Sequence, residues 1–150
     1  MAVEYFKGIP LIRPMVDYDN QGFWEAVKNH KLVIQRCKDC GTSVHPPRPC
    51  CPNCNSFKKE WAPASGKGQI YSWVNVTYEK VGYPGMMCPH AIVLVELEEG
   101  TRLITNVVDM KPEDIYIGMP VEVVFEDIAP DLTLYKFKKS KGVKAKKGKK

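Results

Sequence analysis

Residues 37–54 read CKDCGTSVHPPRPCCPNC, and this stretch decides the fold of the chain. It holds two Cys-x-x-Cys pairs separated by a ten-residue spacer, and the thiols of both pairs can converge on one metal ion. Four thiolates complete the tetrahedral shell of Zn²⁺ and leave no open position for water or substrate. The spacing therefore predicts a structural zinc site in a small ribbon, with Cys37, Cys40, Cys51 and Cys54 as its ligands.

The sequence leaves other uses of these cysteines open. Iron in a rubredoxin-like site would have the same four ligands. Disulfides would also use two pairs, but no signal peptide precedes them, which favours a reducing compartment. Cys50 is out of register with Cys54, so we expect it to stay unligated. His45 lies in the spacer and could replace one thiolate, although its simplest role is a surface side chain of the ribbon.

Charge is unevenly distributed along the 150 residues, whose formal net charge is +5. Residues 136–150 hold nine lysines and no acid, so the rest of the chain carries 13 basic and 17 acidic groups, a net charge of −4. We expect residues 138–150 to form a disordered lysine-rich tail, which could attract an anionic partner or simply solubilise the protein. No apolar run reaches the ~18 residues of a membrane span, which favours a cytoplasmic protein without a membrane span.

Residues 1–30 predict an extended arm followed by a short helix. Two prolines in the first 14 residues favour an extended arm, and Asp19 or Asn20 offers an N-cap for a helix of about ten residues. Four side chains fall on one face of this helix: Phe23, Trp24, Val27 and Lys31. We expect Phe23 and Trp24 either to pack the helix onto the ribbon or to face a partner or ligand.

Residues 31–63 predict the zinc ribbon itself. A strand over residues 32–36 leads into the first Cys-x-x-Cys pair, and a second strand over residues 57–62 leaves the second pair. Between the pairs, Pro46, Pro47 and Pro49 predict a rigid loop around Arg48. The guanidinium of Arg48 is then either an anion contact or a plain surface group.

Residues 64–137 predict a small β-barrel that opens with two glycines at positions 66 and 68. Five strands are expected at residues 69–79, 90–98, 102–108, 121–127 and 132–137. A glycine hairpin joins the second to the third, and residues 111–120 leave room for one helical turn. The fold class is therefore mostly β, with a short helix and zinc ribbon followed by a five-stranded OB-fold barrel. Poor alternation over residues 92–97 suggests that both faces of that strand are covered, one by the barrel core and the other by the N-terminal module or a partner.

Few residues offer catalytic chemistry, because the chain has three histidines and no recognisable nucleophile or phosphate-loop motif. Cys88 and His90 could form a thiolate–imidazole pair, or Cys88 could be a small buried side chain. The loop over residues 80–87 is a better candidate for binding, because its glycines flank exposed Tyr83, Met86 and Met87. We expect no catalytic residue in this chain.

The chain resembles the OB-fold proteins with an N-terminal rubredoxin-like zinc ribbon that accompany acyl-CoA enzymes. The resemblance covers about residues 20–137. It rests on FWEA at 23–26, KLVIQRCKDCG at 31–41, PPR at 46–48, CPNC at 51–54, SGKG at 65–68 and GMPVEV at 118–123.

This resemblance implies a non-catalytic zinc-binding subunit that helps a thiolase-superfamily subunit bind a coenzyme A thioester and assemble a hetero-oligomer. Some relatives work with aldolases or hydratases, and this chain is more similar to the small subunits of thiolases that act on benzoylsuccinyl-CoA. The residues expected to contact the partner or acyl-CoA are Phe23, Trp24, Arg48, Tyr83, Met86 and Met87.

Two other functions would fit part of the sequence. Zinc ribbons and OB barrels both bind single-stranded nucleic acid, but the acidic body and the lack of basic neighbours around Tyr71, Trp73 and Tyr78 make nucleic acid unlikely as a partner. An independent acyl-CoA hydrolase would need the Cys88 and His90 pair.

Overall fold

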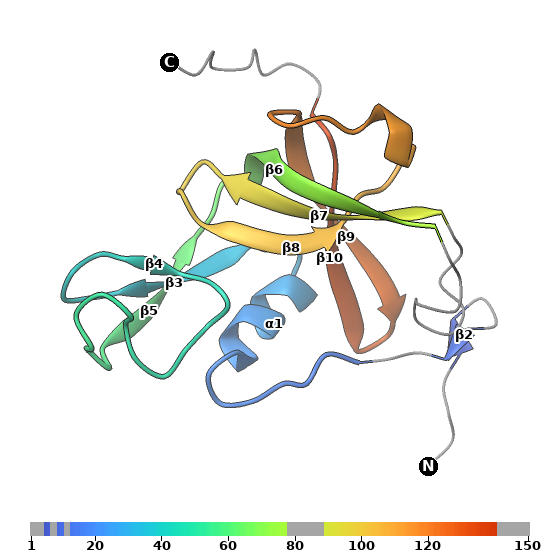
Figure 1. Ribbon diagram of the computed structural model, residues 1–150. Helices are drawn as coiled ribbons and strands as arrows, with labels where there is room; N and C mark the ends of the chain where they lie inside the picture. Colours follow the sequence, from blue (N-terminus) through green and yellow to red (C-terminus); the bar gives the residue numbers. More distant parts are fainter. Residues whose placement is uncertain (1–4, 7–8, 11–12, 78–88, 141–150) are drawn as a thin grey trace, which may run out of the picture.

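The computed structural model describes residues 5–6, 9–10, 13–77 and 89–140. Tyr83, Met86, Met87 and Cys88, together with residues 141–150, lie outside the described residues, so the expectations for them remain predictions. Figure 1 shows a mostly β molecule in which a small ribbon sheet and one short helix lie beside a larger barrel sheet. No helix in the described part is long and apolar enough to cross a membrane.

The N-terminal part contains two short strands and the only α-helix of the described residues. β1 (Tyr5–Phe6) and β2 (Ile9–Pro10) pair antiparallel, and α1 spans Gln21–Lys28. Asn20 is the N-cap residue, but its side-chain amide accepts from the Asp17 backbone N–H and donates to the Met15 carbonyl, so it does not cap the helix amides. The expected face also ends early, because α1 stops at Lys28 and Lys31 lies exposed beyond it.

The ribbon sheet has the order β4-β3-β5, all antiparallel. Its strands are β3 (Val33–Cys37), β4 (Ser43–Val44) and β5 (Lys59–Pro63). Strands β3 and β5 lead into and away from the cysteine stretch, as the sequence predicts. The turn from His45 to Pro46 has a cis peptide bond.

The barrel sheet has the order β10-β9-β6-β7-β8, again antiparallel throughout. Its strands are β6 (Lys67–Val76), β7 (His90–Leu97), β8 (Arg102–Asn106), β9 (Pro120–Ala129) and β10 (Leu132–Lys139), with η1 (Pro112–Asp114) between β8 and β9. The edges meet where the Val108 N–H donates to the Phe137 carbonyl at 2.9 Å, and where the Thr105 hydroxyl donates to the Tyr135 carbonyl. This order and closure are those of an OB-fold barrel.

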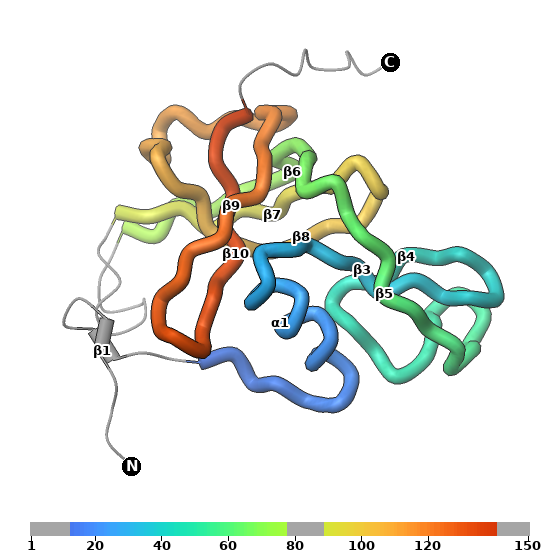
Figure 2. Tube along the Cα trace, turned by 180° about the vertical axis from the view of Figure 1, so that it is seen from behind, coloured from blue at the N-terminus to red at the C-terminus, as the bar shows by residue number. Residues whose placement is uncertain are grey.

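Ribbon, helix and barrel share one hydrophobic core. The helix lies between the two sheets, as both views of the chain show (Figure 1 and Figure 2). Phe23, only 2% exposed, places its ring against Tyr135 of β10 and His45 of the ribbon, with ring centroids 5.4 and 5.3 Å apart. Buried residues of α1 and β3 join those of the barrel in one cluster, which includes Val27, Leu32, Ile34, Ile70, Val93, Val95, Leu103, Val121 and Phe137.

A hydrogen bond and a ring stack fix the end of the helix to the barrel. His30 adopts a positive φ of 54°, which turns the chain out of α1. Its Nε2 lies 2.9 Å from Asp127 Oδ1, and its ring stacks on Phe125. Hydrogen bonds from His30 and Thr133 hold the pKa of Asp127 below its ordinary value. The carboxylate is thus ionised and available to hold the helix terminus at neutral pH.

Two sequence expectations concern the barrel. Burial alternates along β7: Ala91, Val93, Val95 and Leu97 point into the core, while residues of the other face are half-buried. The outer face is therefore not fully buried within the described residues, and its covering by a partner stays a prediction. At the C-terminus, β10 continues to Lys139, and Lys138 pairs with Glu122, because the acidic partners on β9 compensate the lysine charge. Residues 138 and 139 thus belong to the sheet, not to a disordered tail.

Candidate metal centre

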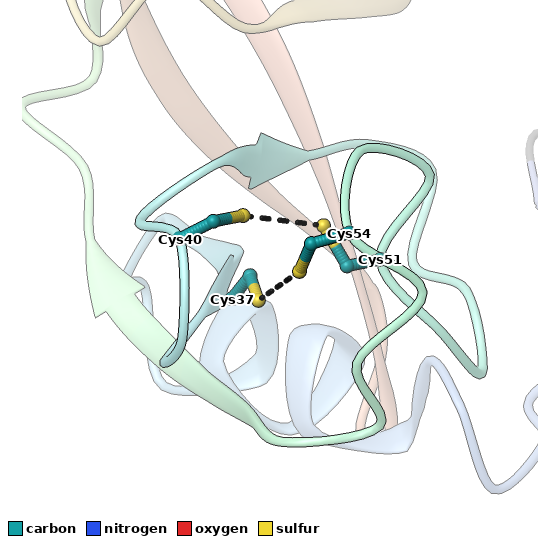
Figure 3. A group of neighbouring side chains, drawn as sticks. All are labelled: Cys37, Cys40, Cys51 and Cys54. Atoms are coloured by element: carbon teal, nitrogen blue, oxygen red, sulfur yellow. Dashed lines mark hydrogen bonds between the residues drawn. The ribbon is translucent and has the colours of Figure 1, made fainter.

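The four predicted cysteine ligands converge at one end of the ribbon (Figure 3). The Sγ atoms of Cys37 and Cys54 lie 3.6 Å apart, as do those of Cys40 and Cys51, and all four lie within 4.8 Å of one another. A tetrahedral Zn²⁺ with bonds of about 2.3 Å needs sulfur atoms about 3.8 Å apart. The arrangement fits zinc, whose chemistry in a closed four-thiolate site is structural.

Backbone turns explain why each Cys-x-x-Cys pair directs both thiols to one point. In residues 37–42, the Gly41 N–H donates to the Cys37 carbonyl, and Gly41 takes a φ of +73°. In residues 51–56, the Asn55 N–H donates to the Cys51 carbonyl, and Asn55 takes a φ of +59°. Glycine and asparagine tolerate this left-handed conformation best, so the sequence can close both turns.

The four thiols differ in exposure. Cys37 and Cys51 are buried, whereas Cys40 and Cys54 are exposed. The Thr42 hydroxyl lies 3.1 Å from Cys40 Sγ, and this hydrogen bond, with others from the Thr42 backbone and the Asn53 side chain, lowers the pKa of Cys40 to about 6. A thiol that ionises readily favours metal binding, because the ligand form is the thiolate.

The two neighbouring candidates for the metal lie outside the cluster. Cys50 is a half-buried free cysteine and does not belong to the group of four converging thiols. His45 packs against Phe23 instead of facing the thiols, and burial lowers its pKa to about 4. It is therefore a half-buried packing residue and not the surface side chain that we expected.

A buried glutamine holds the loop that carries Arg48. The Gln35 side chain, 3% exposed, donates to the Arg48 carbonyl at 2.9 Å and accepts from the Arg48 N–H at 2.8 Å. Among the residues that the structure describes, the exposed Arg48 guanidinium has no hydrogen-bond or ion-pair partner. Sequence reasoning missed Gln35, although a polar residue directly after the apolar run 32–34 of the predicted strand 32–36 was an available signal.

Phe23 and Trp24 differ in burial and in what their side chains contact. Phe23 is fully buried, so its packing role holds and its side chain has no surface to offer to a ligand. Trp24 is half-buried and lines a cavity of about 430 Å³ between the arm, α1 and the turn from β9 to β10. Arg13 and Asp131 close one side of this cavity with an ion pair of 3.0 Å.

The outer face of β6, β7 and β8 is apolar. Register places Leu94 beside Ile104, and Ile92 beside Val74, on the side opposite the core. Ile104 is 67% exposed and Val74 is 55% exposed. We call these four residues the outer apolar face. Sequence reasoning expected this side of residues 92–97 to be covered by the N-terminal module or a partner, but it did not identify Val74 and Ile104 as its neighbours.

An aromatic–arginine pair borders the outer apolar face. The Arg102 guanidinium lies 3.6 Å from the centre of the Tyr71 ring and pairs with Glu96 at 3.0 Å. The expectation that Tyr71 has no basic neighbour is therefore wrong, because the strand register brings Arg102 to it from β8. Glu96 already neutralises this cation, so it offers little free charge to a nucleic-acid backbone.

Two protein-family models match consecutive parts of the chain. Residues 24–60 match the rubredoxin-like zinc ribbon domain of ChsH2, and residues 61–126 match the C-terminal OB-fold domain of ChsH2. A DUF35 domain-containing scaffold protein of Methanocaldococcus jannaschii is 41% identical over 110 residues, which cover 72% of this chain and 77% of that protein. The chain belongs to the ChsH2-type DUF35 family.

A longer relative and a solved structure extend the comparison. A probable enoyl-CoA hydratase alpha subunit of Thermomonospora curvata is 45% identical over 126 residues, which are 84% of this chain but 39% of that protein. This DUF35 chain thus spans about two fifths of that relative. The solved structure titled Ltp2-ChsH2(DUF35) aldolase matches with a TM-score of 0.78 and 45% identity, over 85% of this chain and 98% of that chain.

The match to a thiolase subunit is shorter. The benzoylsuccinyl-CoA thiolase subunit BbsA of Thauera aromatica is 32% identical over 68 residues, which cover 45% of each chain. The DUF35 fold is therefore shared with proteins of hydratase, aldolase and thiolase names, and the benzoylsuccinyl-CoA role stays a prediction.

Proposed function

We propose that this DUF35 chain is a non-catalytic subunit that docks on a thiolase- or aldolase-type catalytic subunit and completes an acyl-CoA enzyme complex. The names of three relatives support this class of partner: a thiolase subunit, a hydratase alpha subunit and an aldolase solved with a ChsH2 DUF35 component. The metal centre supports a non-catalytic role, because four thiolates leave no position for substrate on the metal.

The outer apolar face is the observation that carries the proposal. Four aliphatic side chains gather there on three paired strands, with Tyr71 and Arg102 at the border. Contiguous exposed apolar surface favours a partner, and tyrosine and arginine are enriched among residues that contribute most to protein–protein binding. The ion pair to Glu96 already orients Arg102, so docking would cost less side-chain entropy.

Arg48 and Trp24 remain the candidates for acyl-CoA or partner contact. Arg48 lies on a loop that Gln35 holds in place, and its guanidinium has no partner among the described residues, which suits a phosphate or carboxylate. Trp24 lines the cavity beside Arg13 and Lys28. Tyr83, Met86 and Met87, which follow β6 in the sequence, are proposed as further contacts to the partner or acyl-CoA. Cleavage of benzoylsuccinyl-CoA is one candidate reaction of the complex, supported by the identity with BbsA.

Affinity purification from the native host tests the proposal. The full chain carrying a tag should bring down a stoichiometric thiolase- or aldolase-like chain that mass spectrometry identifies. Ile104→Asp should reduce its recovery more than tenfold, because a charge cannot be buried unpaired in an apolar interface. Ile117→Asp is the matched control, since Ile117 is 71% exposed away from the outer apolar face, and it should retain the partner.

Two results would contradict the proposal. One is recovery of nucleic acid without any acyl-CoA enzyme, which would favour the single-stranded nucleic-acid function. The other is equal recovery of the catalytic chain by both aspartate variants, which would remove the outer apolar face from the interface. Circular dichroism of both variants shows whether the fold is retained.

A further inference from the structure

The two cysteine turns form a structural repeat with one clear difference. Residues 37–42 and 51–56 have equivalent backbone hydrogen bonds, and each repeat ends in a hydroxyl residue, Thr42 or Ser56. The Thr42 hydroxyl contacts the thiol of its own repeat, at Cys40. The Ser56 hydroxyl instead donates to Asp39 Oδ2 of the other repeat, at 2.6 Å. The second repeat therefore uses its hydroxyl to bind the first.

Asp39 has further contacts to the second half of the ribbon. Its other carboxylate oxygen accepts from Lys58 Nζ at 3.3 Å, and the Ser56 hydroxyl also accepts the Lys58 backbone N–H. Asp39 is the third residue of the first repeat and Ser56 is the last residue of the second, so the two repeats contact each other through these side chains.

We propose that Asp39 is a positioning residue of the metal centre, which holds the two cysteine turns together through Ser56 and Lys58. Each turn supplies two thiols, and the ten-residue spacer alone does not fix one turn against the other. A charge-assisted hydrogen bond between the turns sets their separation before the metal binds. Such partners outside the ligand set typically change metal affinity by 10- to 100-fold when removed.

Zinc affinity of the purified full chain tests this positioning role. Competition with a chromophoric chelator should show affinity falling about tenfold or more for Asp39→Ala and for Ser56→Ala. The double variant should lose little more than the worse single variant, because both changes break the same bond. Glu60→Ala is the matched control: Glu60 pairs with Arg36 on the same ribbon at 2.6 Å and should keep the wild-type affinity.

Cobalt spectroscopy separates positioning from loss of a ligand. Co²⁺ bound to Asp39→Ala should keep the absorption of a four-thiolate site while its affinity falls. The proposal is overturned if both single variants bind zinc within twofold of wild type, if Glu60→Ala weakens binding as much, or if the losses of the two variants simply add. The measurement uses this chain alone, so its result is independent of the catalytic partner.

Discussion

At the scale of single residues, two buried polar side chains of the ribbon have opposite hydrogen-bond status. Gln35 satisfies both ends of its amide on the Arg48 backbone. His45 has a buried Nδ1 without a partner in the described part of the chain. A buried polar atom without a partner lowers stability, and the missing hydrogen bonds also disfavour the charged imidazolium. His45 should therefore be a point of acid sensitivity.

Replacing His45 with Phe should reduce the loss of stability in acid. Burial lowers the pKa of His45 from 6.5 to about 4, so between these values the unfolded chain binds a proton that the folded chain does not. Stability is highest above pH 6.5 and falls as the pH drops toward 4, by at most about 3 kcal/mol from this residue. Denaturant unfolding of both proteins at pH 7 and pH 4.5 measures the difference, since thiolate protonation affects both alike. An equal loss in both proteins would contradict this role.

Residue patterns predicted the metal ligands better than the contacts around them. The Cys-x-x-Cys register selects Cys51 over Cys50 from spacing alone. The bond between Asp39 and Ser56 and the clamp of Gln35 on Arg48 join positions 17 and 13 residues apart. Such contacts depend on how the two turns and the loop meet in space, which no local periodicity encodes.

At the scale of elements, the start of β6 depends on two close backbone approaches. The Gly66 carbonyl accepts from the Val123 N–H at 2.7 Å, and Gly66 has a φ of +72°. A Cβ on Gly66 would lie 2.4 Å from Val123 Cγ1, and one on Gly68 would lie 2.4 Å from the Glu96 carbonyl oxygen. These glycines therefore let β6 pass close to β9 and β7 where the barrel begins.

Gly66→Ala should lower the free energy of unfolding by about 2–4 kcal/mol, because it combines a left-handed backbone with a steric clash. Gly100→Ala provides the matched control. Gly100 has a similar φ of +80° but nothing within 4 Å of the added Cβ, so it should lose only about 1–2 kcal/mol. Urea denaturation of both variants measures the comparison, and equal losses would show that the packing against Val123 has no effect.

Helices and strands with strong local sequence signals were predicted correctly. The errors concern the ends of two elements, which tertiary contacts determine. The five barrel strands, the Gly100 hairpin and the helical turn follow from pattern and turn residues. The helix is shorter than expected because His30 turns the chain toward Asp127. β10 is longer because Lys138 pairs with Glu122 of β9. Contacts with β9 therefore set both boundaries.

At the scale of the whole molecule, one core connects the metal-binding and barrel modules. Phe23 of α1 contacts both His45 and Tyr135, and the Ala64 N–H donates to the Leu32 carbonyl where the chain passes between them. The sequence predicted a domain boundary between residues 31–63 and 64–137 from the glycines that follow the ribbon. Its patterns do not show which apolar residues of the two units meet in the core.

Removing zinc should therefore destabilise the barrel as well as the ribbon. Metal binding supplies much of the folding free energy of small zinc modules, and loss of the ribbon uncovers Tyr135 and its neighbours. Hydrogen exchange with excess chelator should show faster exchange in β3 and α1 and also in β10. The Cys37→Ser variant should have this faster exchange without chelator. Unchanged protection of β10 in the chelated protein would contradict the coupling.

The helix between the two sheets also limits how this chain can be recombined. A cut between Pro63 and Lys67 would leave Leu32 and Ile34 uncovered in one fragment, and Tyr135 without its helical neighbours Phe23 and Trp24 in the other. Neither fragment should fold well alone, since each would expose apolar core surface that promotes aggregation. Gene fusions and engineered chimaeras should therefore transfer the ribbon, helix and barrel together. In one longer relative, the segment that matches this chain over 126 residues makes up 39% of the protein.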